Sequence, residues 1–270
     1  LSLEPTPPAN AFVPKELVGT EQAVFPLDVF FCGTCGHVQL LDVVDPQLLF
    51  ENYVYVSGTS PVFVKHFKDY ANDVLNTYQP PKGTLVVDIG SNDGTLLSFF
   101  QKAGQTVLGI DPAKGISQEA TKRGIETWCD FFTPDLSERI KTARGAAHVI
   151  TANNVFAHAD DLVGIVQGVW DLLAPEGVFV FEVSYLLDVI EKTLFDTVYH
   201  EHLDYHALKP LVPFLRRHGL HLFHAERIPS HGGSIRVFAA LEAGGRRTSD
   251  ELTALLEAED IGKLSEPGVY

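Results

Sequence analysis

Hydrophobic and polar positions follow an alternating pattern from residue 84 onward. Short apolar runs rich in β-branched residues, such as TLVVDIG, are followed by segments whose apolar residues recur every three or four positions, such as 94–104. The expected strands are 84–90, 106–111, 125–132, 148–155, 177–185, 221–228 and 234–241. Strands that alternate with helices at this spacing predict an α/β fold, with a mostly parallel sheet covered on both faces.

Two connections depart from a simple alternation of strands and helices. Only residues 229–233 separate the last two expected strands, which is too short for a crossover helix, so these strands should pair antiparallel. Residues 186–219, between the fifth and sixth strands, are long for a plain crossover and contain the richest polar cluster of the chain. This pattern predicts a main domain over 66–245 that carries an insertion at 186–219.

The first 65 residues have a different character. Prolines punctuate short segments, and Cys32 and Cys35 lie in a tight Gly-containing turn between β-prone residues, which predicts a small ribbon-like module over 1–65. Apolar residues in 61–78 are spaced for one face of a helix, which would lead from this module into the main domain.

Composition narrows the range of partners. The 270 residues include 20 Lys and Arg against 35 Asp and Glu, a formal net charge of −15, which argues against nucleic acid or an anionic membrane surface as the main partner. No apolar run is long enough for a spanning helix, and the start lacks the features of a signal peptide. Three cysteines do not make a disulfide framework, so a cytoplasmic location is expected.

The segment VVDIGSNDG ends the first expected strand of the main domain and opens a helix. Gly90 permits a sharp turn and close approach of a ligand to the backbone, and Asp111 at the end of the next strand can accept both hydroxyl protons of a ribose. A dinucleotide site would have glycine in place of Asn92, and the acidic Asp93 would repel a pyrophosphate. These features favour S-adenosylmethionine over an ordinary strand-turn-helix. The predicted cofactor residues in this region are Asp88, Gly90, Asn92, Gly94 and Asp111.

Further cofactor contacts are expected at the next two strand ends. Asp130 and Phe131 would hold the adenine by a polar contact and a ring face. Asn153 and Asn154 lie at the carboxyl edge, where open α/β sheets bind ligands. The alternatives are that Phe131 is a core residue and that one asparagine only caps a turn.

The polar cluster FDTVYHEHLDYH at 195–206 suggests acid–base chemistry. On a helix, Tyr199, His202 and His206 would share a face. In an extended segment, Tyr199 and Glu201 would face away from His200 and His202. A histidine suits proton abstraction next to a carbonyl, an adjacent glutamate would fix its tautomer, and a tyrosine hydroxyl would bind an enolate oxygen. A metal site and a solvated loop are the alternatives, although H-E-H lacks the spacing of H-E-x-x-H.

The pair Cys32 and Cys35, followed by Gly36, has the form of a zinc knuckle. A structural zinc needs four ligands, and the sequence offers no second C-x-x-C. His37 is an alternative third ligand, whereas Cys129 in an expected strand should be a buried apolar residue.

These motifs taken together resemble the S-adenosylmethionine-dependent C-methyltransferases that act on nucleotide-linked 4-keto deoxysugars, enzymes of deoxysugar and antibiotic biosynthesis. The resemblance is carried by PPANAFV, FCGTCGHVQL, ENYVYVSGTS, VVDIGSNDGTLL, GIDPAKGI, ITANNVFAHADDL, FDTVYHEHLDY and HGGSIRVF. It implies an N-terminal zinc module, a class I methyltransferase domain, and base-assisted methylation of a carbon next to a ketone.

The resemblance also assigns roles. His202 would be the base and Glu201 its orienting partner, while Tyr199 and Tyr53 (or, as an alternative, Tyr55) would steady the keto oxygen. The family's zinc is completed by a C-x-x-C that would precede Leu1, and its C-terminal domain would make 246–270 the start of a truncated region. An O-methyltransferase and a cofactor-binding subunit without chemistry remain alternatives. The acceptor carbon, the nucleotide and the oligomeric state are left undecided.

Overall fold

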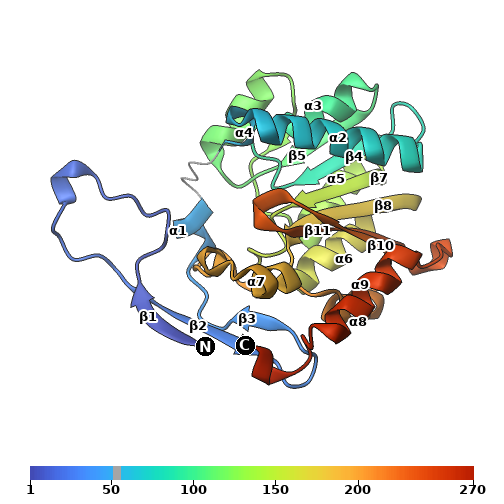
Figure 1. Ribbon diagram of the computed structural model, residues 1–270. Coiled ribbons are helices and arrows are strands. Elements are labelled where there is room, and N and C mark those ends of the chain that lie inside the picture. Colours follow the sequence, from blue (N-terminus) through green and yellow to red (C-terminus); the bar gives the residue numbers. More distant parts are fainter. Residues whose placement is uncertain (51–55) are drawn as a thin grey trace.

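Two β-sheets organise the chain, which a computed structural model describes over residues 1–50 and 56–270 (Figure 1). The larger is seven-stranded, in the order β10-β11-β8-β7-β4-β5-β6, and the smaller has the order β1-β2-β3-β9. The large sheet contains β4 (Leu85–Ile89), β5 (Thr106–Ile110), β6 (Thr127–Trp128), β7 (Ala147–Asn153), β8 (Leu173–Ser184), β10 (Leu220–Ile228) and β11 (Ser234–Leu241).

Strand directions in the large sheet confirm the predicted mostly parallel α/β fold. Strands β4 to β8 pair parallel with their neighbours, and β11 lies antiparallel between β8 and β10. The β10–β11 pair is the predicted antiparallel connection, because the short turn 229–233 can only reverse the chain. Helices cover both faces of this sheet.

Alternate residues of the central strands face different helices, as the period of two requires. Val86 packs with residues of α2 (Pro61–Tyr78) and α3 (Thr95–Lys102), whereas Val87 packs with residues of α5 (Pro134–Arg144) and α6 (Leu162–Leu172). Both valines are fully buried, which explains why the strand reads as a continuous apolar run. The helix α4 (Lys114–Lys122) joins β5 to β6.

Helix α2 coincides with the predicted helix over 61–78. The Ser60 hydroxyl accepts a hydrogen bond from the Phe63 N–H at 3.4 Å, and Pro61 occupies the first turn, where its missing N–H costs nothing. Gln79 ends the helix in a left-handed conformation, before two prolines.

The third expected strand is much shorter than predicted. Only Thr127–Trp128 pairs with β5, and the chain then forms a loop up to Thr133, whose hydroxyl caps α5 by accepting the Leu136 N–H at 3.2 Å. Cys129 is therefore exposed, and the prediction that it is buried was wrong. The same loop places Asp130 and Phe131 beyond the sheet edge.

The smaller sheet joins the N-terminal residues to the insertion. It contains β1 (Ser2–Thr6), β2 (Phe25–Phe31), β3 (Val38–Leu40) and β9 (Asp204–Tyr205). Strand β9 comes from the insertion and pairs antiparallel with β3, with Val38 opposite Tyr205. The N-terminal ribbon and the insertion thus share one sheet. We call residues 1–50 the N-terminal module.

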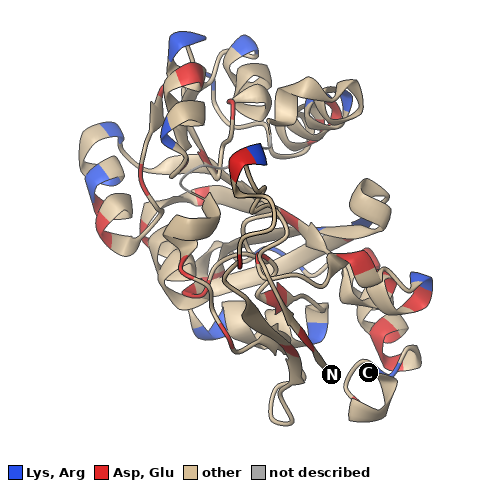
Figure 2. Cartoon of the chain, turned by 90° about the vertical axis from the view of Figure 1, so that its left-hand side faces the viewer, with Lys and Arg blue, Asp and Glu red and all other residues tan. Residues whose placement is uncertain are grey.

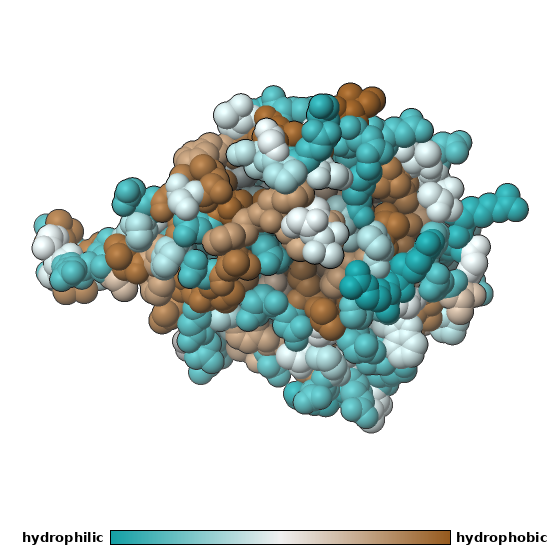
Figure 3. Space-filling view, turned by 90° about the horizontal axis from the view of Figure 1, so that it is seen from below, coloured by the Kyte–Doolittle hydropathy of each residue, from teal (hydrophilic) through white to brown (hydrophobic). Residues whose placement is uncertain are grey.

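A loop projects from the N-terminal module between β1 and β2 (Figure 1). Phe12 and Val18 in this loop are 75% and 73% exposed. Figure 3 shows hydrophobic side chains gathered on this side of the molecule. The short helices of this part of the chain are η1 (Lys15–Leu17), α1 (Pro46–Phe50) and η2 (Ser57–Thr59).

The remaining helical elements lie in the chain after residue 185. They are α7 (Leu186–Lys192), η3 (Phe195–Thr197), α8 (Leu208–Arg217), η4 (Ser230–Gly232), η5 (Glu242–Gly244), α9 (Asp250–Ile261) and η6 (Pro267–Val269). Glu259 of α9 accepts the N–H groups of Leu208 and Lys209 at 2.6 and 2.9 Å, so it caps the N-terminus of α8. The final residue, Tyr270, contacts Phe31 of the N-terminal module, with ring centroids 5.4 Å apart.

In Figure 2, Lys and Arg residues lie scattered on separate helices among Asp and Glu residues. Within residues 1–50 and 56–270, none of the helices combines the length and the apolar character that crossing a membrane requires.

Candidate active site

One cavity of about 830 Å³ at the carboxyl edge of the large sheet brings together the two predicted sites. Its wall includes Asp88, Gly90, Asn92, Asp111, Asp130, Phe131, Asn153 and Asn154 from the predicted cofactor set, and Tyr199 and His202 from the insertion. Gly94 and Glu201 do not line it. Residues predicted to bind the cofactor and residues predicted to transfer a proton, which are far apart in sequence, therefore face the same space.

The β4–α3 loop forms one side of the cavity. Gly90 has a φ of +68°, and a Cβ there would lie 2.4 Å from Cγ2 of Val155. Gly94, the N-cap of α3, has a φ of +75°, and its Cβ would lie 2.8 Å from Cγ2 of Ile125. Only glycine fits at either position, so the loop presents bare backbone to a ligand at Gly90, while Gly94 allows close helix packing.

The N-terminus of α3 is already occupied by Asp93. Its Oδ1 accepts the N–H of Thr95 at 3.2 Å, and its Oδ2 accepts the N–H of Gly58 at 3.2 Å and contacts Arg123 at 3.2 Å. The side chain is only 2% exposed. A helix end that already holds a carboxylate cannot also bind a pyrophosphate, which agrees with the preference for a ligand without phosphate.

Two buried aspartates flank this loop. Asp111 accepts the N–H groups of Asn92 and Ala113, each at 2.9 Å, and its oxygens retain further capacity to accept hydrogen bonds. Asp88 accepts the hydroxyl of Thr151 at 2.6 Å. Burial raises the pKa of Asp111, and it raises the pKa of Asp88 to about 7. Asp111 thus lines the cavity with capacity to accept further hydrogen bonds.

Asn153 ends β7 and Asn154 follows it. The Oδ1 atom of Asn153 is buried and has no hydrogen-bond partner among the described residues, so it can accept a hydrogen bond from a ligand. Asn154 has a φ of +56°, and its N–H donates to the Glu182 carbonyl oxygen at 2.8 Å. Both residues line the cavity.

Asp130 and Phe131 lie in the loop after β6. Phe131 is 40% exposed and lines the cavity, which excludes the alternative that it belongs to the core. Its N–H donates to Oδ1 of Asp130 at 3.0 Å. The pair therefore offers a ring face and a carboxylate on the same side of the cavity.

Residues 199–202 form a tight turn. The N–H of His202 donates to the Tyr199 carbonyl oxygen at 2.9 Å, so the segment is neither of the two expected forms, helix or extended strand. The turn directs Tyr199 and His202 into the cavity, while Glu201 and His200 are buried outside it.

A hydrogen-bonded chain defines the tautomer of His202. Its Nδ1 lies 2.7 Å from the Thr197 carbonyl oxygen, which can only accept, so Nδ1 carries the proton in the neutral ring. Its Nε2 is then an acceptor and lies 2.9 Å from the Tyr199 hydroxyl. Burial lowers the pKa of His202 to about 4, with a smaller lowering from His231. The ring is consequently neutral, and able to accept a proton, near pH 7.

Glu201 does not orient His202, and that prediction was wrong. The Thr197 carbonyl has this role instead. Glu201 is 1% exposed, and its Oε1 accepts the side-chain N–H of Asn10 at 2.6 Å. Burial raises the pKa of its carboxyl group. A turn sends neighbouring side chains in different directions, which an alternating pattern does not anticipate.

Two further histidines line the cavity and were not singled out from the sequence. The ring centroid of His158 lies 5.0 Å from that of His202, and burial lowers the pKa of His158 to about 3. His231, in the β10–β11 turn, has a φ of +49° and packs on Phe63 at 5.0 Å. Both lie within quoted motifs, ITANNVFAHADDL and HGGSIRVF, which was the available signal.

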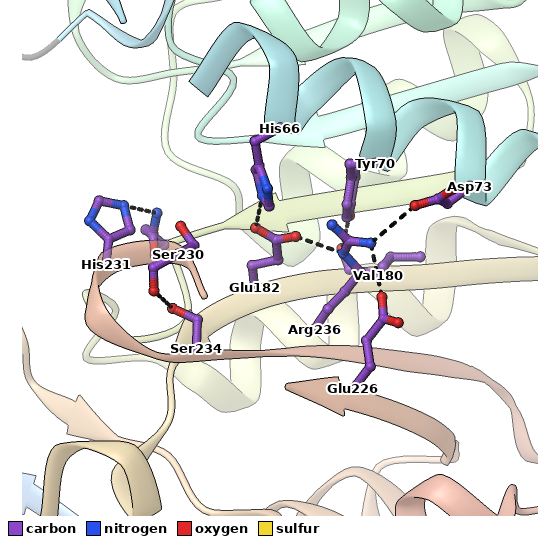
Figure 4. Close-up of polar contacts among 11 residues, drawn as sticks. His66, Tyr70, Asp73, Val180, Glu182, Glu226, Ser230, His231, Ser234 and Arg236 are labelled. Carbon is purple, nitrogen blue, oxygen red and sulfur yellow. Dashed lines mark hydrogen bonds and ion pairs between the residues drawn. The ribbon is translucent and has the colours of Figure 1, made fainter. Parts of the chain in front are cut away.

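A polar network beside the His231 turn fixes α2 to the sheet (Figure 4). Glu182 accepts from His66 at 2.7 Å and from Nε of Arg236 at 2.6 Å. The guanidinium of Arg236 also lies over the ring of Tyr70, 4.3 Å from its centroid. This network holds the cavity wall formed by α2 against β8 and β11.

The turn from Cys32 to Cys35 holds the two cysteines of the predicted zinc knuckle. Backbone N–H groups of Cys35 and Thr34 lower the pKa of Cys32, which favours a thiolate. His37 is engaged elsewhere, since its Nε2 lies 2.6 Å from Oδ1 of Asp204. The described ranges contain no cluster of three or more His, Cys, Asp or Glu residues that could hold a metal ion. A structural zinc needs four ligands, and the prediction names two of them, Cys32 and Cys35, in these ranges.

Tyr53, the predicted active-site tyrosine, and its alternative Tyr55 lie outside the described residues.

Comparison with known proteins gives matches along most of the chain. A family model described as "Putative zinc binding domain" (Methyltransf_13) matches residues 1–50, and one described as "Methyltransferase domain" (Methyltransf_12) matches residues 87–179. The chain is 35% identical to C-methyltransferase NovU of Streptomyces niveus over 259 residues, which cover 96% of this chain and 62% of NovU. It is 25% identical to the mitochondrial ubiquinone biosynthesis O-methyltransferase of Bos taurus over 52% of this chain and 39% of that protein. It thus spans less than two thirds of either relative.

Solved structures share the fold. An S-adenosylmethionine-dependent methyltransferase from Clostridium acetobutylicum matches 66% of this chain and 92% of its own with a TM-score of 0.52 and 14% identity. The magnesium protoporphyrin IX methyltransferase of Synechocystis PCC 6803, with bound SAH, matches 70% of this chain and 88% of its own with a TM-score of 0.50 and 15% identity. The chain therefore has the fold of the class I S-adenosylmethionine-dependent methyltransferases, and its sequence is similar to C-methyltransferase NovU along nearly its whole length.

Proposed function

We propose that this protein methylates a carbon adjacent to the ketone of a nucleotide-linked 4-keto deoxysugar. The observation that carries the proposal is the Tyr199–His202 pair in the same cavity as the cofactor residues. The similar protein NovU is a C-methyltransferase, which supports the same reaction type.

In this proposal His202 removes the proton next to the ketone. Its Nε2 is unprotonated, because the Thr197 carbonyl holds the ring proton on Nδ1. The Tyr199 hydroxyl, 2.9 Å from Nε2 without substrate, donates to the keto oxygen as that oxygen gains negative charge. The enolate charge beside the ring stabilises the imidazolium and so compensates for its lowered pKa.

S-adenosylmethionine supplies an electrophilic methyl group when bound. Asp111 and the Gly90 backbone would hold its ribose and methionine portions, and Asn153 with Phe131 would contact the adenine or an adjacent polar atom.

The charge of the cavity wall bears on how an acceptor enters. Among the described residues that line it, none is Lys or Arg, and the acidic ones are Asp45, Asp88, Asp111, Asp130, Asp160, Asp161 and Asp196. This wall suits a cationic sulfonium and a neutral sugar. The phosphates of a nucleotide sugar would have to lie beyond it.

Isotope labelling tests the proposal. The chain is incubated with methyl-labelled S-adenosylmethionine and a 4-keto nucleotide sugar, and the labelled position is located by NMR. Label on a carbon next to the ketone supports the proposal. Label on oxygen would make the protein an O-methyltransferase, and cofactor binding without any transfer would make it a binding subunit.

A further inference from the structure

The N-terminal module holds the turn that carries His202. Nε2 of His200 lies 3.2 Å from the Phe25 carbonyl oxygen, and Glu201 accepts the side-chain N–H of Asn10 at 2.6 Å. Two consecutive residues of the 199–202 turn therefore contact the module, while Tyr199 and His202, on either side of them, face the cavity.

The Glu201 carboxyl group depends on Asn10 for its hydrogen bonding. The Glu201 side chain is buried, and its second oxygen, Oε2, has no hydrogen-bond partner among the described residues. The Asn10 amide is thus the one donor to this carboxyl group in residues 1–50 and 56–270. A buried carboxyl group loses its water, so its position depends strongly on the donor that remains.

The rest of the same segment is also attached to the module. Strand β9 follows the turn directly and pairs with β3, and the Asp204 carboxylate lies 2.6 Å from His37. The chain from 200 to 205 is therefore fastened at both ends to residues 1–50. Asn10 is at the cavity end of this attachment, because it also lines the cavity wall.

We propose that Asn10 is a positioning residue, which fixes the 199–202 turn through Glu201 and so keeps His202 and Tyr199 directed into the cavity. The reaction that it serves rests on the proposed function, but the contact itself does not. In this view Glu201 acts through its hydrogen bond to Asn10 and not by transferring a proton.

Exchanging donor and acceptor tests this role. Asn10→Asp places two carboxyl groups against each other at pH 8 and should lower kcat by about 10–100-fold, the effect of a small displacement of reacting groups, with the KM for S-adenosylmethionine unchanged. Glu201→Gln still allows an amide hydrogen bond and should lose less activity. The double variant Asn10→Asp with Glu201→Gln restores a donor–acceptor pair and should recover most of the loss.

A second measurement does not depend on the reaction. Amide hydrogen exchange of residues 195–206, followed by mass spectrometry, should accelerate in Asn10→Asp and return toward the wild-type rate in the double variant. Asn72→Asp, on the exposed side of α2, is the matched control for an added charge. Asn10 is itself exposed, so its substitution changes one contact without emptying a core position.

The outcomes separate the two proposals. If the wild-type chain transfers no methyl group, the proposed function fails, while the exchange rates still report on Asn10. If Asn10→Asp leaves the exchange of 195–206 at the wild-type rate, or if the double variant exchanges and reacts no better than Asn10→Asp, the positioning role is wrong. A Glu201→Gln variant that is more impaired than Asn10→Asp would show that the carboxylate itself is needed.

Discussion

The Tyr199 hydroxyl lies 2.9 Å from Nε2 of His202, so the atom proposed to remove the substrate proton is already hydrogen-bonded before a substrate enters. A keto oxygen that takes the hydroxyl of Tyr199 leaves Nε2 free to accept a proton from carbon. The same pair of residues thus couples enolate stabilisation to release of the base.

Replacing His202 by Ala should abolish proton abstraction. Solvent deuterium exchange at the carbon to be methylated, measured by NMR with the product cofactor bound, should fall by about 10²–10⁴, and methyl transfer should fall with it. Affinity for S-adenosylmethionine should stay near the wild-type value. His218→Ala, at the end of α8, is the control. Normal exchange in the His202 variant would exclude it as the base.

The variant Tyr199→Phe keeps the ring and removes only the hydroxyl group. It should lower kcat by about 10²–10³ through loss of the donor to the developing enolate, with cofactor affinity unchanged. Stopped-flow measurement of a single turnover separates this effect from product release. An unchanged rate of the chemical step would remove Tyr199 from the proposed mechanism.

Cofactor affinity should depend on Asp111. Asp111→Ala removes a charged acceptor and should weaken binding of S-adenosylmethionine by about 1.5–3 kcal/mol, as measured by calorimetry. Asp135→Ala, in the first turn of α5, is a control outside the cavity. Unchanged affinity would place Asp111 outside the binding site, and competition by NAD at similar strength would contradict the cofactor assignment.

The close packing around Gly90 predicts that a larger residue there is destabilising. Gly90→Ala would place a Cβ 2.4 Å from Cγ2 of Val155 at a φ of +68°. It should lower the free energy of unfolding by about 1–3 kcal/mol. It should also weaken binding of the cofactor. Gly115→Ala is the matched control, because a Cβ there has open space. Thermal unfolding and calorimetry measure both effects, and equal behaviour of the two variants would contradict the close contact.

Buried neutral histidines should make the fold sensitive to acid. Burial lowers the pKa of His158 to about 3 and those of His202 and His206 to about 4, whereas the unfolded chain titrates near 6.5. Below pH 6.5 the unfolded state therefore binds more protons, and the free energy of unfolding should fall by roughly 2 kcal/mol or more by pH 5. Asp88, with a pKa raised to about 7, contributes with the opposite sign.

Urea unfolding at pH 7, 6 and 5 measures this dependence. The decrease in the free energy of unfolding between pH 7 and pH 5 should be smaller in His158→Gln, because this variant lacks one of the three buried histidines. A pH dependence that is the same in His158→Gln as in the wild-type chain would contradict the lowered pKa of His158.

Local sequence was sufficient for the elements that depend on neighbouring residues. The period of apolar residues predicted α2 with its observed bounds, and the glycines of VVDIGSNDG predicted the sharp turn between β4 and α3. These features follow from backbone sterics and side-chain periodicity within a few residues. The third strand was misjudged because its apolar residues continue past Trp128, where no neighbouring strand remains to pair with them.

The side-chain directions at 199–202 were decided only by the tertiary structure. The motif identified Tyr199 and His202, but whether Glu201 faces the base or the module depends on Asn10, which is 191 positions away. Likewise, β9 forms because β3 offers an edge with which it can pair. A segment of two residues does not form a stable strand on its own. Contacts between distant segments form only when the whole chain has folded, and no local pattern encodes them.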